Sequence, residues 1–361
     1  MTAVAQSQGS AAAVLRNSKF LSLWIAQVVT QVGGNMVLLG LTVEVFTLTG
    51  KSTSVSLLIL SFLVPAVIFG AIAGVYVDRL DRRMILVTTN VARGLLFLLL
   101  LVVPADIAVI CLITAMISTI STFFGPAEIA MIPVVVPRRQ LLPANSLHIV
   151  TLQASFFLGF ALVGPLVVNV AGQQVLLVMV AASYFLGALL CWTLPSYNPR
   201  IGGANPREGL GEAGSAVATT FSQLSDGVRF IIRNRSIFWP LTYLALTASL
   251  IGVLGVLGPG FATQVLGLSE KDFVVVVLPL GVGLIVGILV LNVYGRLFTR
   301  RRGIEGGLIA LGLTLLALSL AQPLTTRFAF AISLLSIVIV VAFAAGIAYA
   351  FVAVPAQTQL Q

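Results

Sequence analysis

The sequence consists mainly of apolar runs that have the length of a bilayer-crossing helix. At 1.5 Å of rise per residue, about 20 apolar residues span the roughly 30 Å of hydrocarbon in a membrane. Helices satisfy all their backbone hydrogen bonds internally, which lipid demands. The sequence therefore predicts an all-α integral membrane protein with ten transmembrane helices, over Phe20–Phe46, Val55–Tyr76, Met84–Val103, Ile107–Phe124, Ser146–Val170, Val175–Leu194, Ile237–Phe261, Phe273–Leu297, Gly307–Ala321 and Phe328–Val354.

The composition excludes a soluble domain. Of the 361 residues, 59% are hydrophobic and only 9% are charged, whereas about a quarter of the residues of a soluble domain are charged. The net charge of +9 would suit nucleic acid only if the basic residues formed one face of a soluble fold. Because they flank apolar runs instead, we expect membrane lipids as partners and no nucleic acid.

The sequence contains no motif of a common enzyme class. It has no phosphate-binding loop of the form G-x-x-x-x-G-K-[ST], no spacing typical of metal ligands and no nucleophile elbow. Cys111 and Cys191 lie inside apolar runs, so neither predicts a disulfide. We therefore expect a protein that is not an enzyme and that uses no metal and no cofactor.

Lysine and arginine gather on one side of the predicted membrane. With the N-terminus inside, sixteen of the 20 basic residues fall on the cytoplasmic side, and Arg93 lies within an apolar run. Only Lys51, Lys271 and Arg327 fall outside. This bias predicts a cytoplasmic N-terminus and a multi-pass protein of the plasma or inner membrane.

A cluster of charge separates the second and third apolar runs, in the stretch Gly74-Val-Tyr-Val-Asp78-Arg79-Leu-Asp81-Arg82-Arg83. Arginines suit a cytoplasmic loop, but topology does not explain an aspartate four residues after a glycine. The stretch resembles the signature loop between helices two and three of the Major Facilitator Superfamily, which usually has glycine where this chain has Asp81. The resemblance implies a gating motif formed by Gly74, Asp78, Arg79, Arg82 and Arg83.

The pattern recurs, weakened, 221 residues later, in Gly295-Arg-Leu-Phe-Thr299-Arg300-Arg301-Arg302. Many carriers consist of two repeated halves with the substrate site between them. We therefore expect a six-helix bundle over 1–194, a cytoplasmic linker with an amphipathic helix over 195–236, and a four-helix bundle over 237–361. The same offset applied to Leu194 ends the second half near residue 415, so this bundle is expected to be incomplete by about two helices.

Other stretches resemble the macrolide- and siderophore-exporting branch of the same superfamily. They include Asn17-Ser-Lys-Phe20 near the start and Ala144-Asn145-Ser146-Leu147 before the fifth helix. The fifth-helix antiporter motif of that branch keeps Gly164 and Pro165, but other residues replace its further glycines. Coupling to protons is thus implied by the resemblance alone.

Polar side chains inside the apolar runs are costly in lipid and therefore mark candidate functional residues. Gln27, Gln31 and Asn35 recur every four residues and share one face of the first helix. They would line a substrate cavity or form hydrogen bonds between helices. Arg93, about 13 Å into its run, is either a cavity or gate cation or a side chain that snorkels to the interface.

Four further titratable residues are weaker candidates. Glu44 lies about 180° around the helix from Asn35, which favours an interfacial carboxylate over a proton carrier. Glu128 and Glu305 fall at predicted cytoplasmic helix ends, where each is expected to pair with an arginine. His148, the single histidine, is expected at the surface.

Together these features predict a secondary carrier that exports small amphiphilic or hydrophobic compounds, drug-like or siderophore-like, by alternating access. Its partners would be a small-molecule substrate and, by resemblance, protons. An uptake carrier and a lipid translocator share every motif described. The remaining alternative is a truncated, non-transporting remnant that serves as a membrane scaffold or sensor.

Overall fold

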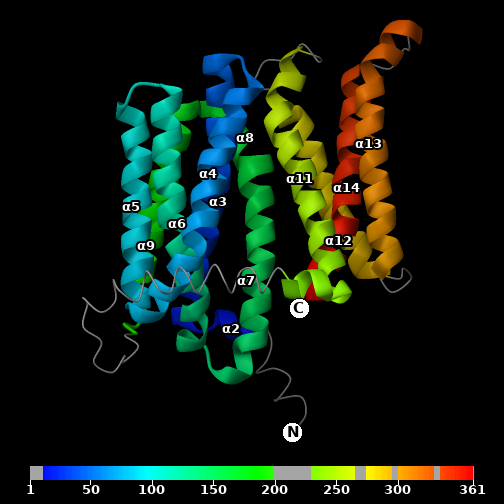
Figure 1. The fold of residues 1–361 in the computed structure, drawn as a ribbon. Coiled ribbons are helices and arrows are strands. Elements are labelled where there is room, and N and C mark those ends of the chain that lie inside the picture. Colours follow the sequence, from blue (N-terminus) through cyan, green and yellow to red (C-terminus); the bar gives the residue numbers. More distant parts are fainter. Residues whose placement is uncertain (1–10, 198–228, 265–273, 295–299, 329–333, 361) are drawn as a thin grey trace. The chain divides into compact units, whose positions relative to one another are not determined.

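The computed structural model describes residues 11–197, 229–264, 274–294, 300–328 and 334–360, and all regular structure in these ranges is helical (Figure 1). Eight helical segments there are long and apolar enough to cross a membrane. The all-α membrane prediction is thereby confirmed. The other two predicted spans coincide with α11 (Arg235–Gln264) and α12 (Val274–Tyr294), so ten crossings stay a prediction.

The chain forms two compact units, Met1–Val217 and Ala218–Gln361, which are described separately. The predicted limits of the two bundles and the linker stay predictions. The helices of the first unit are α2 (Ala11–Leu15), α3 (Ser18–Thr49), α4 (Ser52–Arg79), α5 (Arg82–Val102), α6 (Ile107–Val135), η1 (Arg138–Gln140), α7 (Leu141–Phe156), η2 (Phe157–Val163), α8 (Gly164–Ala171) and α9 (Gln173–Trp192).

Helix α3 lies at the centre of the first unit. It packs against α9, against the α7–η2–α8 segment, and against α4 and α6, while α5 packs against α6 and α9. A buried cluster that includes Phe20, Leu86, Met131 and Cys191 joins α3, α5, α6 and α9. Helices α3, α5 and α6, which carry Gln27, Arg93 and Glu128, are therefore held together with α9 by one apolar core.

Polar side chains fix the ends of these helices. Asn17 caps α3 by accepting from the amides of Lys19 and Phe20, and it donates to the Val135 carbonyl at the end of α6 over 2.7 Å. Asp106 caps α6 in the same way, and Gly50 ends α3 with φ of 64°, a left-handed conformation that favours glycine.

Helix α6 is longer than predicted. We expected this segment to end at Phe124, but the helix continues to Val135 through Pro126 and Pro133. In a membrane helix, proline is tolerated because neighbouring groups satisfy the freed carbonyls. The correction moves Glu128 from a helix end to the helix interior.

The predicted fifth helix contains a π-helical segment, Phe157–Val163, directly before Gly164 and Pro165. Proline lacks the amide hydrogen that a regular α-helical turn uses, and here the Gly164 amide donates to the Gly159 carbonyl, five residues back. Both glycines face α3 closely: a Cβ on Gly164 would lie 3.3 Å from the Cα of Met36, and one on Gly159 would collide with the Val32 carbonyl. Gly164 and Pro165 thus shape the contact with α3.

In the second unit, α14 (Leu334–Leu360) packs against α11, α12 and α13 (Arg300–Phe328). Gly283 of α12 and Gly346 of α14 allow these two helices to pack closely. A Cβ added to either glycine would collide with the backbone of the other helix. Small residues commonly permit such contacts in membranes. Residues 295–299 of the repeated motif and residues 198–228 of the predicted linker lie outside the described residues, whereas 229–233 are helical.

Candidate functional site

Arg93 lies inside the first unit, near the middle of α5, with only 5% of its side chain exposed. Its Nη2 donates to Asn90 Oδ1 over 2.6 Å, and its Nε donates to the Thr89 carbonyl over 3.3 Å. A charge at this depth is costly unless it has partners. The side chain therefore does not snorkel to the interface in this structure.

Two aromatic rings enclose the Arg93 guanidinium. Its Cζ lies 4.3 Å from the ring centre of Phe124 on α6 and 4.6 Å from that of Tyr184 on α9. Tyr184 in turn stacks on Phe97, with ring centres 5.3 Å apart. Because cation–π attraction is strongest where water is excluded, these rings stabilise the buried cation.

Glu128 supplies the opposite charge. It is only 2% exposed on α6, and its carboxylate and the Arg93 guanidinium attract each other electrostatically. Its Oε1 is buried without a hydrogen-bond partner among the described residues. Arg93 and Glu128 are therefore two buried ionisable groups of opposite charge type on the neighbouring helices α5 and α6, and one oxygen of Glu128 has unused hydrogen-bonding capacity among the described residues.

The polar residues of α3 are divided between two environments. Gln27 is buried, and its Nε2 donates to the His148 carbonyl of α7 over 3.1 Å, which fits the helix-to-helix alternative. Asn35 is half-buried and donates to the Gln31 carbonyl within its own helix over 2.8 Å. The assignment of Gln31 and Asn35 to a substrate cavity stays a prediction. The His148 side chain is buried, which corrects its predicted surface position.

Glu44 lies near the opposite end of α3 and accepts from Gln173 Nε2 at the start of α9 over 3.0 Å. This single neutral partner differs from the cationic partner of Glu128. Of the two membrane acids Glu44 and Glu128, the structure therefore places only Glu128 beside a buried cation.

The predicted gating motif occupies the end of α4 and the start of α5. A Cβ on Gly74 would meet no other atom within 4 Å, and the Asp78 side chain lies outside the described part of the chain. Arg79 is exposed, Arg82 Nη1 donates to the Ala130 carbonyl over 2.9 Å, and Arg83 Nη1 donates to that of Leu194 over 3.3 Å. Arg82 and Arg83 thus hold the loop against α6 and the end of α9, while gating stays a prediction.

Asp81, which stands where glycine is usual, connects the same loop to the end of α9. It caps α5 by accepting from the Arg83 amide over 2.9 Å, and it also accepts from the Ser196 hydroxyl and from the Tyr197 amide. Burial alone would raise the pKa of Asp81, but these hydrogen bonds and the charge of Arg83 lower it below the usual 3.8. The folded state therefore favours the ionised carboxylate.

Replacing Asp81 with alanine is expected to lower the free energy of unfolding by about 2 kcal/mol. About half of this loss comes from the missing helix cap, and the other half comes from the missing hydrogen bonds to Ser196 and Tyr197. Asp106→Ala, which removes only a cap, should cost about 1 kcal/mol. Since the folded pKa of Asp81 is lowered, its contribution is present above about pH 4 and lost as the pH falls through the folded pKa. Unfolding titrations at pH 7 and pH 3 check this, and equal costs for the two variants at pH 7 would contradict it.

Sequence patterns did not identify Asn90, Phe124 or Tyr184 as neighbours of Arg93. Asn90 could have been found, because it lies one helical turn before Arg93 on the same face. Phe124 and Tyr184 come from other helices, and aromatic residues are too frequent in membrane helices to stand out.

The model of the Major Facilitator Superfamily matches residues 23–361. The chain belongs to this superfamily. It is accordingly a multi-pass membrane protein of a transporter superfamily.

Named relatives and solved structures agree with this membership. Two relatives are uncharacterized MFS-type transporters of Bacillus subtilis (strain 168). YfiS is 26% identical over 50% of this chain and 44% of its own length. YkuC is 23% identical over 80% of this chain and 66% of its own length. The chain thus spans less than two thirds of these relatives. Two solved structures share the fold at 14% sequence identity. The nucleoside transporter NupG has a TM-score of 0.65, and the match covers 94% of this chain and 82% of NupG. A bacterial homolog of the human lysosomal transporter Spinster has a TM-score of 0.67, and the match covers 94% of this chain and 74% of the homolog.

Proposed function

We propose that the protein is a secondary carrier that exports small amphiphilic or hydrophobic compounds by alternating access, in exchange for protons. The observation that carries the proposal is the buried pair of Arg93 and Glu128 in two apolar helices. Ionisable residues at membrane depth are rare and commonly form proton relays in transporters.

The pair supplies a way to convert proton binding into a change of conformation. With Glu128 ionised, the two charges offset each other and the site tolerates a dry, closed environment. A proton on Glu128 leaves the Arg93 charge without its counter-ion, which favours a conformation that hydrates the guanidinium. Protonation would in this way shift the equilibrium between two states, as alternating access requires.

Ethidium retention in bacterial cells tests this function. Cells that produce the chain should retain less of the dye, an amphiphilic aromatic cation, than cells with an empty vector, and a protonophore should remove the difference. Higher retention would indicate uptake. Movement of fluorescent phospholipid without dye export would indicate a lipid translocator. Equal ethidium retention in producing and empty-vector cells would favour the non-transporting alternative.

A further inference from the structure

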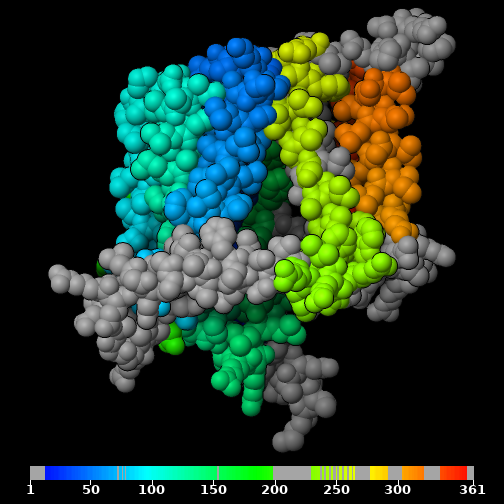
Figure 2. All heavy atoms as spheres, in the orientation of Figure 1, coloured from blue at the N-terminus to red at the C-terminus, as the bar shows by residue number. Residues whose placement is uncertain are grey.

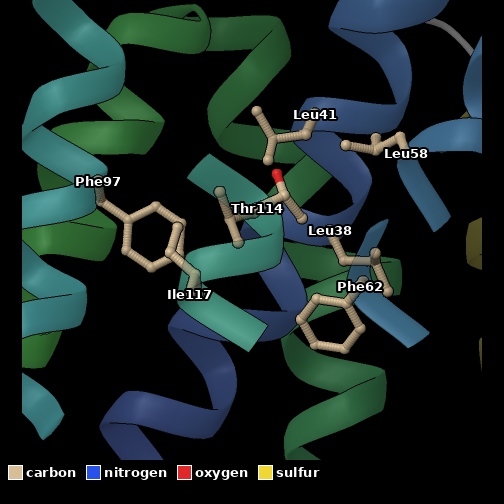
Figure 3. Close-up of a pocket in the computed structure, with 8 residues that line it drawn as sticks. Leu38, Leu41, Leu58, Phe62, Phe97, Thr114 and Ile117 are labelled. Atoms are coloured by element: carbon tan, nitrogen blue, oxygen red, sulfur yellow. The ribbon is translucent and has the colours of Figure 1, made fainter. Parts of the chain in front are cut away.

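A cavity inside the first unit is too small for an organic ligand. It lies between α3, α4, α5 and α6, and Leu41, Phe97 and Ile117 are among the apolar side chains that line it (Figure 3). Its volume of about 20 Å³ is enough for little more than one water. A further organic ligand of the first unit would therefore bind at its surface.

Two cations meet on that surface, at the C-terminal end of α9. Lys19 Nζ donates to the Thr193 carbonyl over 2.6 Å, and Arg83 Nη1 donates to the Leu194 carbonyl over 3.3 Å. Lys19 lies in the first turn of α3, and Arg83 lies in the first turn of α5. Because the two carbonyls belong to consecutive residues, α3 and α5 bring their cations to the same end of α9.

Both cations keep hydrogen-bond donors that no described protein group uses. An ammonium group has three N–H bonds and a guanidinium group has five, and each donates one of them to a carbonyl here. Lys19 is exposed and Arg83 is partly exposed. Arg83 Nε is buried and out of reach of a ligand, whereas Nη2 is neither bonded to a described residue nor buried. An anion could therefore accept from Lys19 Nζ and Arg83 Nη2 while both contacts with α9 remain.

Asp81 in the same loop offsets only part of this positive charge. Its carboxylate interacts electrostatically with Arg83, but its oxygens accept hydrogen bonds from the Arg83 amide, the Ser196 hydroxyl and the Tyr197 amide. Arg82 adds another positive charge, with its Cζ 4.6 Å from the ring centre of Tyr197. The described side chains here thus leave a net positive charge, which attracts anions.

Trp192 indicates that these cations lie at the level of lipid headgroups. It is the last residue of α9, an apolar helix of membrane-spanning length, and 54% of its side chain is exposed. The Cζ of Arg83 lies 5.1 Å from the centre of its ring. Tryptophan concentrates at the membrane interface, because its ring is apolar and its N–H is polar. Arg83 and Lys19 are therefore expected beside lipid phosphates.

Exposed apolar side chains extend from this end along α5 and α9. On α9, Leu186 and Leu189 are exposed, and on α5, Met84 and Leu95 are exposed. The two helices pack against each other, and side chains of α5, coloured cyan, reach the surface of the first unit in Figure 2. Acyl chains would therefore find apolar surface on the same helices whose ends hold the cations.

We propose that Lys19, Arg83 and Trp192 form a binding site for an anionic phospholipid. The lipid phosphate accepts hydrogen bonds from the two cations, and the acyl chains lie along α5 and α9. Basic sites between membrane helices bind anionic headgroups, and this end of the first unit is the one predicted to face the anionic cytoplasmic leaflet. The inference is independent of the proposed carrier function, because lipid binding requires neither transport nor protons.

Native mass spectrometry of the purified chain in a neutral detergent measures lipid binding directly. Dioleoyl phosphatidylglycerol should bind about tenfold more tightly than dioleoyl phosphatidylcholine, which has the same acyl chains but no net charge. Each Lys or Arg near an anionic headgroup contributes about fivefold to binding. The double variant Lys19→Gln with Arg83→Gln should therefore bind phosphatidylglycerol at least about tenfold more weakly, with a far smaller change for phosphatidylcholine.

The double variant Arg138→Gln with Arg139→Gln is the matched control. It removes two exposed arginines of η1 and so causes the same change in net charge. Its binding of phosphatidylglycerol should equal that of the unaltered chain. Equal losses in the two double variants would show a general effect of surface charge, and the proposal would then be wrong. Equal binding of the two lipids by the unaltered chain would also contradict it.

Lys19→Gln alone keeps the test decisive if the first double variant does not fold, because Lys19 is exposed. Thermal unfolding of each purified variant shows whether it is folded. The single variant should bind phosphatidylglycerol about fivefold more weakly. Arg16→Gln, which removes another exposed cation just before α3, should have no effect. Unchanged binding by folded Lys19→Gln would overturn the proposal.

Discussion

Glu128→Gln is expected to reduce proton-driven ethidium export about tenfold or more while leaving the protein folded in the membrane. Glutamine keeps the size of the side chain but cannot bind or release a proton, so the switch at Arg93 is lost. Coupling free energies in proteins correspond to about 5- to 150-fold effects, which sets the expected size. Dye retention in cells, corrected for the amount of membrane-inserted protein, measures the change.

Glu44→Gln provides the matched control. Glu44 is also a membrane acid on the first unit, but its partner is the neutral amide of Gln173. Its replacement should leave proton dependence unchanged. Proton-driven export at full rate by Glu128→Gln, or equal losses in the two variants, would contradict a coupling role for Glu128.

Arg93→Met is expected to lower the free energy of unfolding by about 3 to 5 kcal/mol. Methionine fills a similar volume between Phe124 and Tyr184, but it leaves the Glu128 carboxylate buried without a counter-ion and Asn90 without its charged donor. Unfolding in mixtures of mild detergent and dodecyl sulfate measures the loss.

The double variant Arg93→Met with Glu128→Gln isolates the interaction. Since the second substitution removes the unpaired charge, the double variant should be more stable than Arg93→Met alone by about 1 kcal/mol or more. Strictly additive losses would show that the two side chains do not interact and would remove the basis for the proposed switch.

Much of the fold could be predicted because the bilayer imposes a length. The predicted limits of the helices at Phe20 and Met84 differ from the observed starts at Ser18 and Arg82 by two residues each. The limits failed where polar residues or proline occur inside a helix, as at Glu128 and Pro133 in α6. Packing against neighbouring helices satisfies such residues, and that packing cannot be deduced from one segment alone.

The candidate site was only partly predictable. The cost of a charge in lipid identified Arg93 without a structure. Its enclosure by Phe124 and Tyr184 depends on the rotation of three helices about their axes, which hydrophobicity does not fix when a helix is apolar all round.

Proton movement in liposomes tests whether Glu128 couples transport to protons. The purified chain would be reconstituted with a pH-sensitive dye inside the vesicles, and ethidium would be added outside without any imposed proton gradient. We expect ethidium that enters through the unaltered chain to drive protons across the membrane in the opposite direction, and Glu128→Gln to abolish this proton movement. Ethidium transport without proton movement, or proton movement that persists in Glu128→Gln, would contradict it.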